Sequence, residues 1–163
     1  MKSKTEKMSC YLAGAIRGPE DYIWRKQFVE EYKDELLFRI PSDLVTLDIS
    51  KLRKFGSAAY MTYRTDLDLI DRSDIVVANL LPMASGYPSM GTMFEIGYSR
   101  AKGKLIFIIA DAKRKEHPFV AFGGDGVYSG FEELGVFFHK YLGVLRGGCP
   151  VFDQISVTRF VIE

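Results

Sequence analysis

Two short segments, residues 74–80 and 104–110, are apolar almost throughout, and they constrain the fold more than any other feature of the chain. They have the sequences Asp-Ile-Val-Val-Ala-Asn-Leu and Lys-Leu-Ile-Phe-Ile-Ile-Ala. A strand without polar alternation is buried on both faces, as in a parallel sheet that helices cover on both sides. Residues 90–102, which lie between the two segments, are predicted to form a helix. The pattern therefore predicts a strand, helix, strand unit.

The rest of the chain repeats this alternation. Residues 8–13 predict a first strand that ends at Gly14, and the apolar spacing over 21–38 predicts a helix before Pro41. We expect an α/β fold, a flavodoxin-like or Rossmann-like sandwich with a mostly parallel, five-stranded sheet. The remaining predicted elements are a strand at 44–47, a loop at 51–60, a helix at 61–73, a helix at 131–145, and an edge strand or an intersubunit arm at 157–162.

Length and charge limit the classes of function. With 163 residues, 47% of them hydrophobic, we expect one domain over residues 1–163, with 148–163 as a C-terminal extension. The 22 Lys and Arg nearly balance the 21 Asp and Glu, which argues against a nucleic-acid polymer or an anionic membrane as partner. No apolar stretch reaches the ~20 residues that span a bilayer, so a soluble, cytoplasmic protein is expected. Two cysteines, Cys10 and Cys149, are too few for a disulfide framework or a cysteine metal site.

Parallel sheets bind ligands beyond the carboxyl ends of their strands. Gly14-Ala15-Ile16-Arg17-Gly18 follows the first predicted strand, where two glycines allow a tight turn and close approach of a ligand. Arg17 offers a planar guanidinium that suits a phosphate. On its own this segment equally fits a surface arginine in an ordinary turn.

Ser89 and Glu95 mark the helix after the central strand. Ser89 is suited to cap that helix, and a capped helix start at the ligand edge can hold an anion. Glu95 lies six residues further on, which is roughly 9 Å along a helix, about the span from a nucleotide's 5'-phosphate to its anomeric carbon. A carboxylate there can attack that carbon. The alternative is a solvated glutamate, but the neighbours Phe94 and Ile96 favour partial burial.

Asp66, on the helix before the central strand, is a second candidate. A carboxylate near Glu95 could orient it or, with its pKa raised by the like charge, protonate a departing base. The alternative is one of the many aspartates that helices carry on their surface.

These segments together resemble the nucleoside 2-deoxyribosyltransferase family, and within it the 2'-deoxynucleoside 5'-phosphate N-hydrolases, from about Cys10 to Ile109. The resemblance implies that Glu95 is the nucleophile, that Asp66 assists it and that Tyr11 lies beside the sugar and the catalytic carboxylate. Ser89 stands where enzymes that act on free nucleosides usually carry aspartate, which favours a 5'-monophosphate. The resemblance places the following residues around the substrate: Gly14, Ile16, Arg17, Gly18, Ser89, Gly91 and Met93.

The implied activity is hydrolysis of the N-glycosidic bond of 2'-deoxynucleoside 5'-monophosphates, without metal or cofactor, by a homodimer or larger homo-oligomer. If a second base competes with water, the activity becomes base exchange. Two departures from the family pattern, Ala15 in place of a phosphate-contacting serine and the bulky Met93, keep a third hypothesis open: a nucleotide-binding module without turnover. The base and the preference for deoxyribose are not determined by these residues.

Overall fold

The computed structural model describes residues 7–16, 19–41, 56–81 and 89–147. Its sheet has five strands, all parallel, in the order β2-β1-β3-β4-β5. This confirms the predicted five-stranded α/β fold and gives the strand order of flavodoxin-like proteins. The strands are β1 (Ser9–Gly14), β2 (Leu37–Arg39), β3 (Ile75–Asn79), β4 (Leu105–Ile109) and β5 (Gly126–Tyr128).

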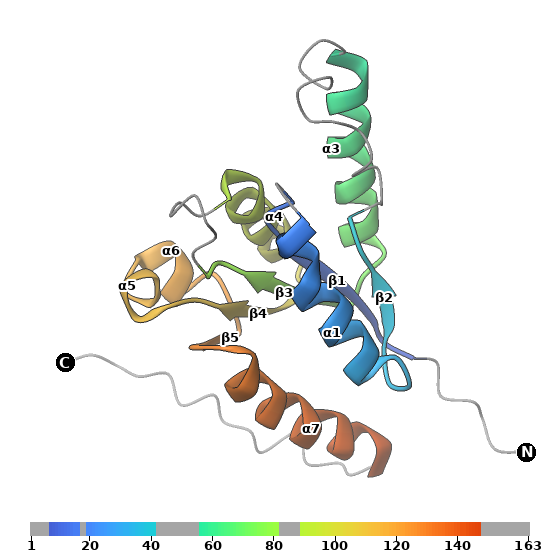
Figure 1. The fold of residues 1–163 in the computed structure, drawn as a ribbon, viewed down its shortest axis with the longest axis vertical. Helices are drawn as coiled ribbons and strands as arrows, with labels where there is room; N and C mark the ends of the chain where they lie inside the picture. The colour runs from blue at the N-terminus through green and yellow to red at the C-terminus, as the bar shows by residue number, and fades with distance from the viewer. Residues whose placement is uncertain (1–6, 17–18, 42–55, 82–88, 148–163) are drawn as a thin grey trace, which may run out of the picture.

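Helices cover both faces of the sheet (Figure 1). Side chains of α1 (Ile23–Tyr32) and α7 (Phe131–Gly147) share one core with the strands, while α3 (Gly56–Asp71), α4 (Met90–Ala101) and α6 (Pro118–Ala121) contribute to the other. A 3-10 turn, η1 (Pro19–Tyr22), precedes α1, and α5 (Ala112–Lys115) precedes α6. β1, β3 and β4 are buried on both faces, as their apolar sequences predicted.

The first helix is shorter than predicted. Residues 21–38 were expected to be helical, but α1 ends at Tyr32, whose carbonyl accepts hydrogen bonds from the amides of both Glu35 and Leu36. The amide of Leu37 then bonds the carbonyl of Met8 and starts β2. The prediction was wrong over 33–38 because Leu36, Leu37 and Phe38 continue the helical spacing, and the three residues of β2 are too few to show strand alternation.

Two other predicted boundaries differ from the structure. The predicted loop at 51–60 is wrong from Gly56 onward, because α3 already begins there. The fifth strand of the sheet is β5, a segment for which no strand was predicted, since Gly-Val-Tyr lacks an apolar run. The predicted strands at 44–47 and 157–162 lie outside the described residues. Within the part of the chain that is described, no helix is both long and apolar enough to cross a membrane.

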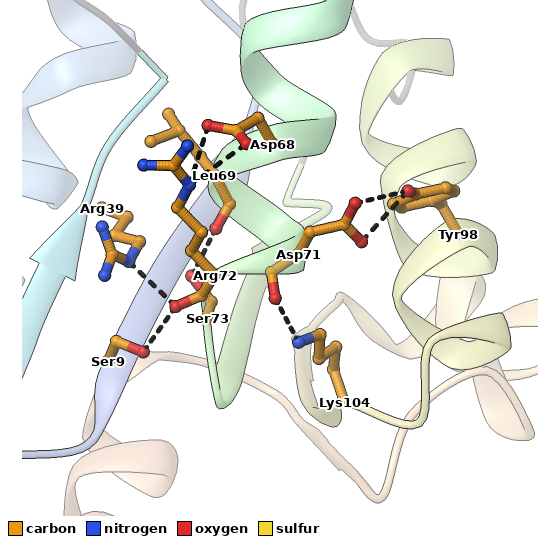
Figure 2. A network of polar contacts seen from close by, with 9 residues as sticks. All are labelled: Ser9, Arg39, Asp68, Leu69, Asp71, Arg72, Ser73, Tyr98 and Lys104. Atoms are coloured by element: carbon orange, nitrogen blue, oxygen red, sulfur yellow. Dashed lines mark hydrogen bonds and ion pairs between the residues drawn. The ribbon is translucent and has the colours of Figure 1, made fainter.

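Side chains from three other elements cap the carboxyl end of α3 (Figure 2). The carbonyl of Arg72 accepts hydrogen bonds from Ser9 Oγ at 2.9 Å and Arg39 Nε at 3.0 Å. The carbonyl of Asp71 accepts one from Lys104 Nζ at 2.7 Å. The last carbonyls of a helix lack partners within the helix, so these contacts satisfy them and fix the end of α3 to the amino edge of the sheet.

Candidate active site

Glu95 meets Tyr11 above the sheet. Tyr11, in β1, is fully buried on the face that α4 covers, and its hydroxyl donates a hydrogen bond of 2.6 Å to Glu95 Oε1. A bond of this length between a hydroxyl and a carboxylate is charge-assisted and stronger than a neutral one. The structure thus brings together two of the residues that the sequence placed in the catalytic group.

The pKa of Glu95 is raised to about 7, mainly by burial and in part by the negative charge of Asp66. The hydrogen bond from Tyr11 and the positive charge of Arg25 act in the opposite direction. Glu95 therefore changes its charge near neutral pH. This agrees with the partial burial expected from its apolar neighbours.

Asp66 faces the same region from α3. Its Oδ1 is buried and has no hydrogen-bond partner among the described residues. Burial raises the pKa of Asp66 to about 6, against the opposing charge of Arg25. Buried polar atoms almost always have a partner, so an unpaired carboxylate oxygen beside a second carboxylate is a place where a ligand or a water completes the bonding.

A polar contact fixes the two carboxylate-bearing helices to each other (Figure 2). The hydroxyl of Tyr98, three residues after Glu95 on α4, donates to the two carboxylate oxygens of Asp71 on α3 at 3.0 and 3.1 Å. Lys102 Nζ lies 3.1 Å from the same carboxylate and 5.1 Å from the centre of the Tyr98 ring. Since Asp71 follows Asp66 on α3, this contact helps to set the separation between Asp66 and Glu95.

Ser89 is the N-cap of α4, as predicted. Its φ of −68° and ψ of 121° are extended, and its Oγ accepts a hydrogen bond of 3.4 Å from the amide of Thr92. Gly91 in the first turn is exposed, and a Cβ there would meet only Ser89 Oγ, at 3.6 Å. Among the described residues, no other atom therefore crowds the first turn of α4 at Gly91. Whether Ser89 and Gly91 contact a substrate stays a prediction.

The turn after β1 approaches α1 closely. A Cβ on Gly14 would lie 3.0 Å from Trp24 Cζ2 and 3.1 Å from Arg25 Nη2, which explains glycine at this position. Ala15 is buried and Ile16 is partly exposed beyond it. The predicted phosphate ligand Arg17 and its neighbour Gly18 lie outside the described residues.

Met93 lies apart from the carboxylates. Its side chain lines a groove of about 510 Å³ between α4 and α6, which Glu95 does not line. Met93 was expected to narrow the space over the sugar. In the structure it faces α6, while Glu95 on the same helix faces β1. The lining residues of the groove are Met93, Phe94, Ile96, Gly97, Arg100, Pro118, Phe119, Phe122 and Gly123.

Sequence reasoning missed Arg25. Its side chain is 1% exposed and donates to four backbone carbonyls, three of them in β1 and the turn that follows. The sequence contained a signal, because Arg25 falls at helical spacing with Phe28 and Tyr32, two residues of the buried stripe of α1. A guanidinium in an apolar stripe needs buried acceptors.

The described residues include no group of three or more His, Cys, Asp or Glu side chains that could hold a metal ion. The chemistry available to this edge of the sheet is that of two partly buried carboxylates with raised pKa values, a tyrosine hydroxyl on one of them and a capped helix start. Paired carboxylates of this kind serve as nucleophile and acid in glycoside cleavage.

Comparison with known proteins gives the family. The model of the nucleoside 2-deoxyribosyltransferase family matches residues 10–139, and the chain belongs to this family. Members are N-glycosidases or deoxyribosyltransferases, so the chain is an enzyme of this kind. A protein of Thermofilum pendens named "Putative 2'-deoxynucleoside 5'-phosphate N-hydrolase 1" is 27% identical over 109 residues, which cover 67% of this chain and 72% of that protein.

Solved structures share the fold. A 2-deoxyribosyltransferase from Bacillus psychrosaccharolyticus matches with a TM-score of 0.63 and 16% identity, over 82% of this chain and 95% of the other. One from Leishmania mexicana matches with a TM-score of 0.59 and 22% identity, over 82% and 98%. A CMP N-glycosidase from Clostridium botulinum matches with a TM-score of 0.51 and 16% identity, over 85% and 99%.

Proposed function

We propose that this protein hydrolyses the N-glycosidic bond of 2'-deoxynucleoside 5'-monophosphates, with Glu95 as the nucleophile. The observation that carries the proposal is the partly buried Glu95 carboxylate, held by Tyr11 at 2.6 Å and near a second partly buried carboxylate, Asp66. Burying a carboxylate costs stability, so two partly buried carboxylates in one region indicate a functional site. The relative from Thermofilum pendens supports hydrolysis of a phosphorylated substrate.

In the first step, one oxygen of ionised Glu95 attacks the anomeric carbon. The bond from that carbon to the base nitrogen breaks, and its electron pair leaves with the base. The leaving base takes up a proton, which protonated Asp66 is able to donate. The unpaired buried oxygen of Asp66 suits this role. The pKa of Asp66, raised to about 6, lies below that of Glu95, so the reactive form with ionised Glu95 and protonated Asp66 is a minor one near neutral pH.

In the second step, water attacks the anomeric carbon of the ester and releases deoxyribose 5-phosphate and the Glu95 carboxylate. Asp66, now ionised, accepts a proton from that water. If a second base enters before water, its nitrogen attacks the same carbon, and the product is a new deoxynucleotide. Base exchange is therefore the second outcome of one intermediate.

The phosphate is proposed to bind over the first turn of α4. Ser89 caps this helix, Gly91 is exposed among the described residues, and the amide-rich end of a helix favours an anion. The turn after β1, with Arg17, is proposed to supply the other side of the phosphate site. An aspartate at position 89 would repel the phosphate, whereas serine accommodates it.

The test is a product assay over matched substrates. The protein is incubated with each of the four common deoxynucleoside 5'-monophosphates and with the corresponding deoxynucleosides, and free base is measured by chromatography. Base released from monophosphates and not from nucleosides is the expected result. Labelled product after addition of a second free base would assign base exchange instead. Binding of monophosphates without release of any base would leave only a non-catalytic module.

We further propose that copies of the chain associate in a cytoplasmic homo-oligomer, as the resemblance implies. Large apolar side chains on the α4 and α6 side support association: Met90 is 86% exposed and Phe119 and Phe122 are each 74% exposed. Light scattering after size exclusion tests this proposal, because a mass of one chain at micromolar concentration would contradict it.

A further inference from the structure

Arg25 is a charged residue that the structure buries almost completely, at 1% exposure. Its hydrogen bonds go to backbone carbonyls. Nε donates to Leu12 at 3.2 Å, Nη2 to Gly14 at 2.8 Å, and Nη1 to Ala15 at 3.0 Å and Asp21 at 2.8 Å. The guanidinium thus binds both the turn that leaves β1 and the segment that leads into α1.

The surroundings of Arg25 fit a flat guanidinium and no other cation. Its Cζ lies 4.7 Å from the ring centre of Trp24 and 5.4 Å from that of Tyr22. Gly14 approaches so closely that a Cβ there would lie 3.1 Å from Nη2. A lysine ammonium has three donors at one point and cannot reach four carbonyls spread around a plane.

The turn that Arg25 binds is the one that the proposed function places against the substrate. Gly14 and Ala15 extend from the carboxyl end of β1, where ligands of parallel sheets bind. Their carbonyls point to Arg25 and are occupied by it. This fixes the orientation of the peptide groups in the turn, and hence the direction in which its amides can face a ligand.

We propose that Arg25 is a positioning residue that holds Gly14 and Ala15, where the chain leaves β1, in the shape that receives the 5'-phosphate of the substrate, without touching the substrate. This inference rests on the proposed function. The positive charge of Arg25 also acts on Glu95 and Asp66 and lowers the pKa of both carboxyl groups. Burial lowers the pKa of Arg25 itself below its ordinary value.

Binding to a protein that cannot turn over tests this role. In the Glu95→Gln background, calorimetry compares the four deoxynucleoside 5'-monophosphates with the four deoxynucleosides, with and without Arg25→Lys. We expect Arg25→Lys to weaken monophosphate binding at least tenfold and nucleoside binding about twofold or less. The matched control is Lys26→Gln, an exposed cation next to Arg25 on the same helix, which should change neither.

A second variant covers the case in which Arg25→Lys does not fold. Gly14→Ala keeps the guanidinium and adds a methyl group 3.0 Å from the Trp24 ring and 3.1 Å from Nη2, which forces the turn and Arg25 apart. The same selective loss for monophosphates is expected. Equal loss for monophosphates and nucleosides in both variants, or no loss, would overturn the role of Arg25 alone. Absence of monophosphate binding in the Glu95→Gln protein itself would overturn the proposed function as well.

Discussion

The hydroxyl of Tyr11 lies 2.6 Å from Oε1 of Glu95, a residue 84 positions later in the chain. The contact exists because β1 and α4 pack face to face at the ligand edge of the sheet. It is the only hydrogen bond to the Glu95 side chain that the described residues show. The orientation and the charge of Glu95, the proposed nucleophile, therefore depend on one hydrogen-bond donor, the Tyr11 hydroxyl.

Tyr11→Phe should lower activity most strongly at low pH. The hydrogen bond from Tyr11 lowers the pKa of Glu95, so its loss raises that pKa above about 7 and leaves less carboxylate at neutral pH. A hydrogen bond to a charged group contributes about 1.5–3 kcal/mol, so we expect a loss of roughly 10- to 100-fold at pH 6 and a smaller one at pH 9. A pH profile of kcat/KM parallel to that of the unmodified protein would contradict this role.

Glu95→Gln should stabilise the protein at alkaline pH. The folded-state pKa of Glu95 is raised from 4.5 to about 7, so the folded protein binds its proton more tightly than the unfolded chain does. Between these two values, the stability contributed by protonated Glu95 falls as the pH rises, and above about 7 it is lost. The neutral glutamine avoids this loss. Thermal unfolding should therefore show a higher Tm for the variant at pH 8.5 and a smaller difference at pH 4.5.

Asp66→Asn should have two separable effects. Loss of the proposed acid should lower kcat by roughly 10²- to 10⁴-fold, the usual contribution of general acid catalysis. Loss of its negative charge should also lower the pKa of Glu95, which moves the acid limb of kcat/KM to lower pH. Asp68→Asn is the control, since Asp68 is an exposed partner of Arg72 on the same helix. Similar losses in both variants would remove Asp66 from the reaction.

Tyr98→Phe should loosen the contact between α3 and α4. It removes the two hydrogen bonds to Asp71 and leaves the apolar ring in place, so we expect a loss in kcat of about tenfold with little change in KM, because positioning errors near 1 Å are costly. The protein should unfold within a few degrees of its usual Tm. Lys33→Gln, in an exposed ion pair with Glu30, is a control that should keep kcat unchanged.

The strands that dominate the sheet were predictable because burial on both faces leaves a strong local signal. Val76 and Ile108 sit in runs that only a covered parallel sheet explains. β2 and β5 carry no such signal: each has three residues and lies at a sheet edge, and pairing with β1 or β4 determines it. The position of β2 and β5 therefore depends on contacts with distant segments and not on their own sequences.

The candidate site likewise contains residues that the sequence predicts and contacts that it does not predict. Glu95, Ser89 and Asp66 were found from spacing and from resemblance, and α4 begins where the serine predicted. The unpaired oxygen of Asp66 and the four carbonyls around Arg25 depend on how distant segments pack, so no local pattern encodes them. Met93 was placed near the substrate from the resemblance. It lies two residues before Glu95, about 200° away around the helix, and lines a groove against α6.

The most direct test of the account is the rate of base release from deoxynucleoside 5'-monophosphates by the unmodified protein and by Glu95→Ala, at pH 8. At this pH the raised pKa of about 7 leaves Glu95 mostly ionised in the unmodified protein. The account predicts release that falls by at least ~10³-fold in Glu95→Ala, as expected when a nucleophile is removed, while calorimetry shows that the variant still binds the monophosphate. Release by Glu95→Ala within tenfold of the unmodified rate would contradict the assignment of Glu95 as the nucleophile.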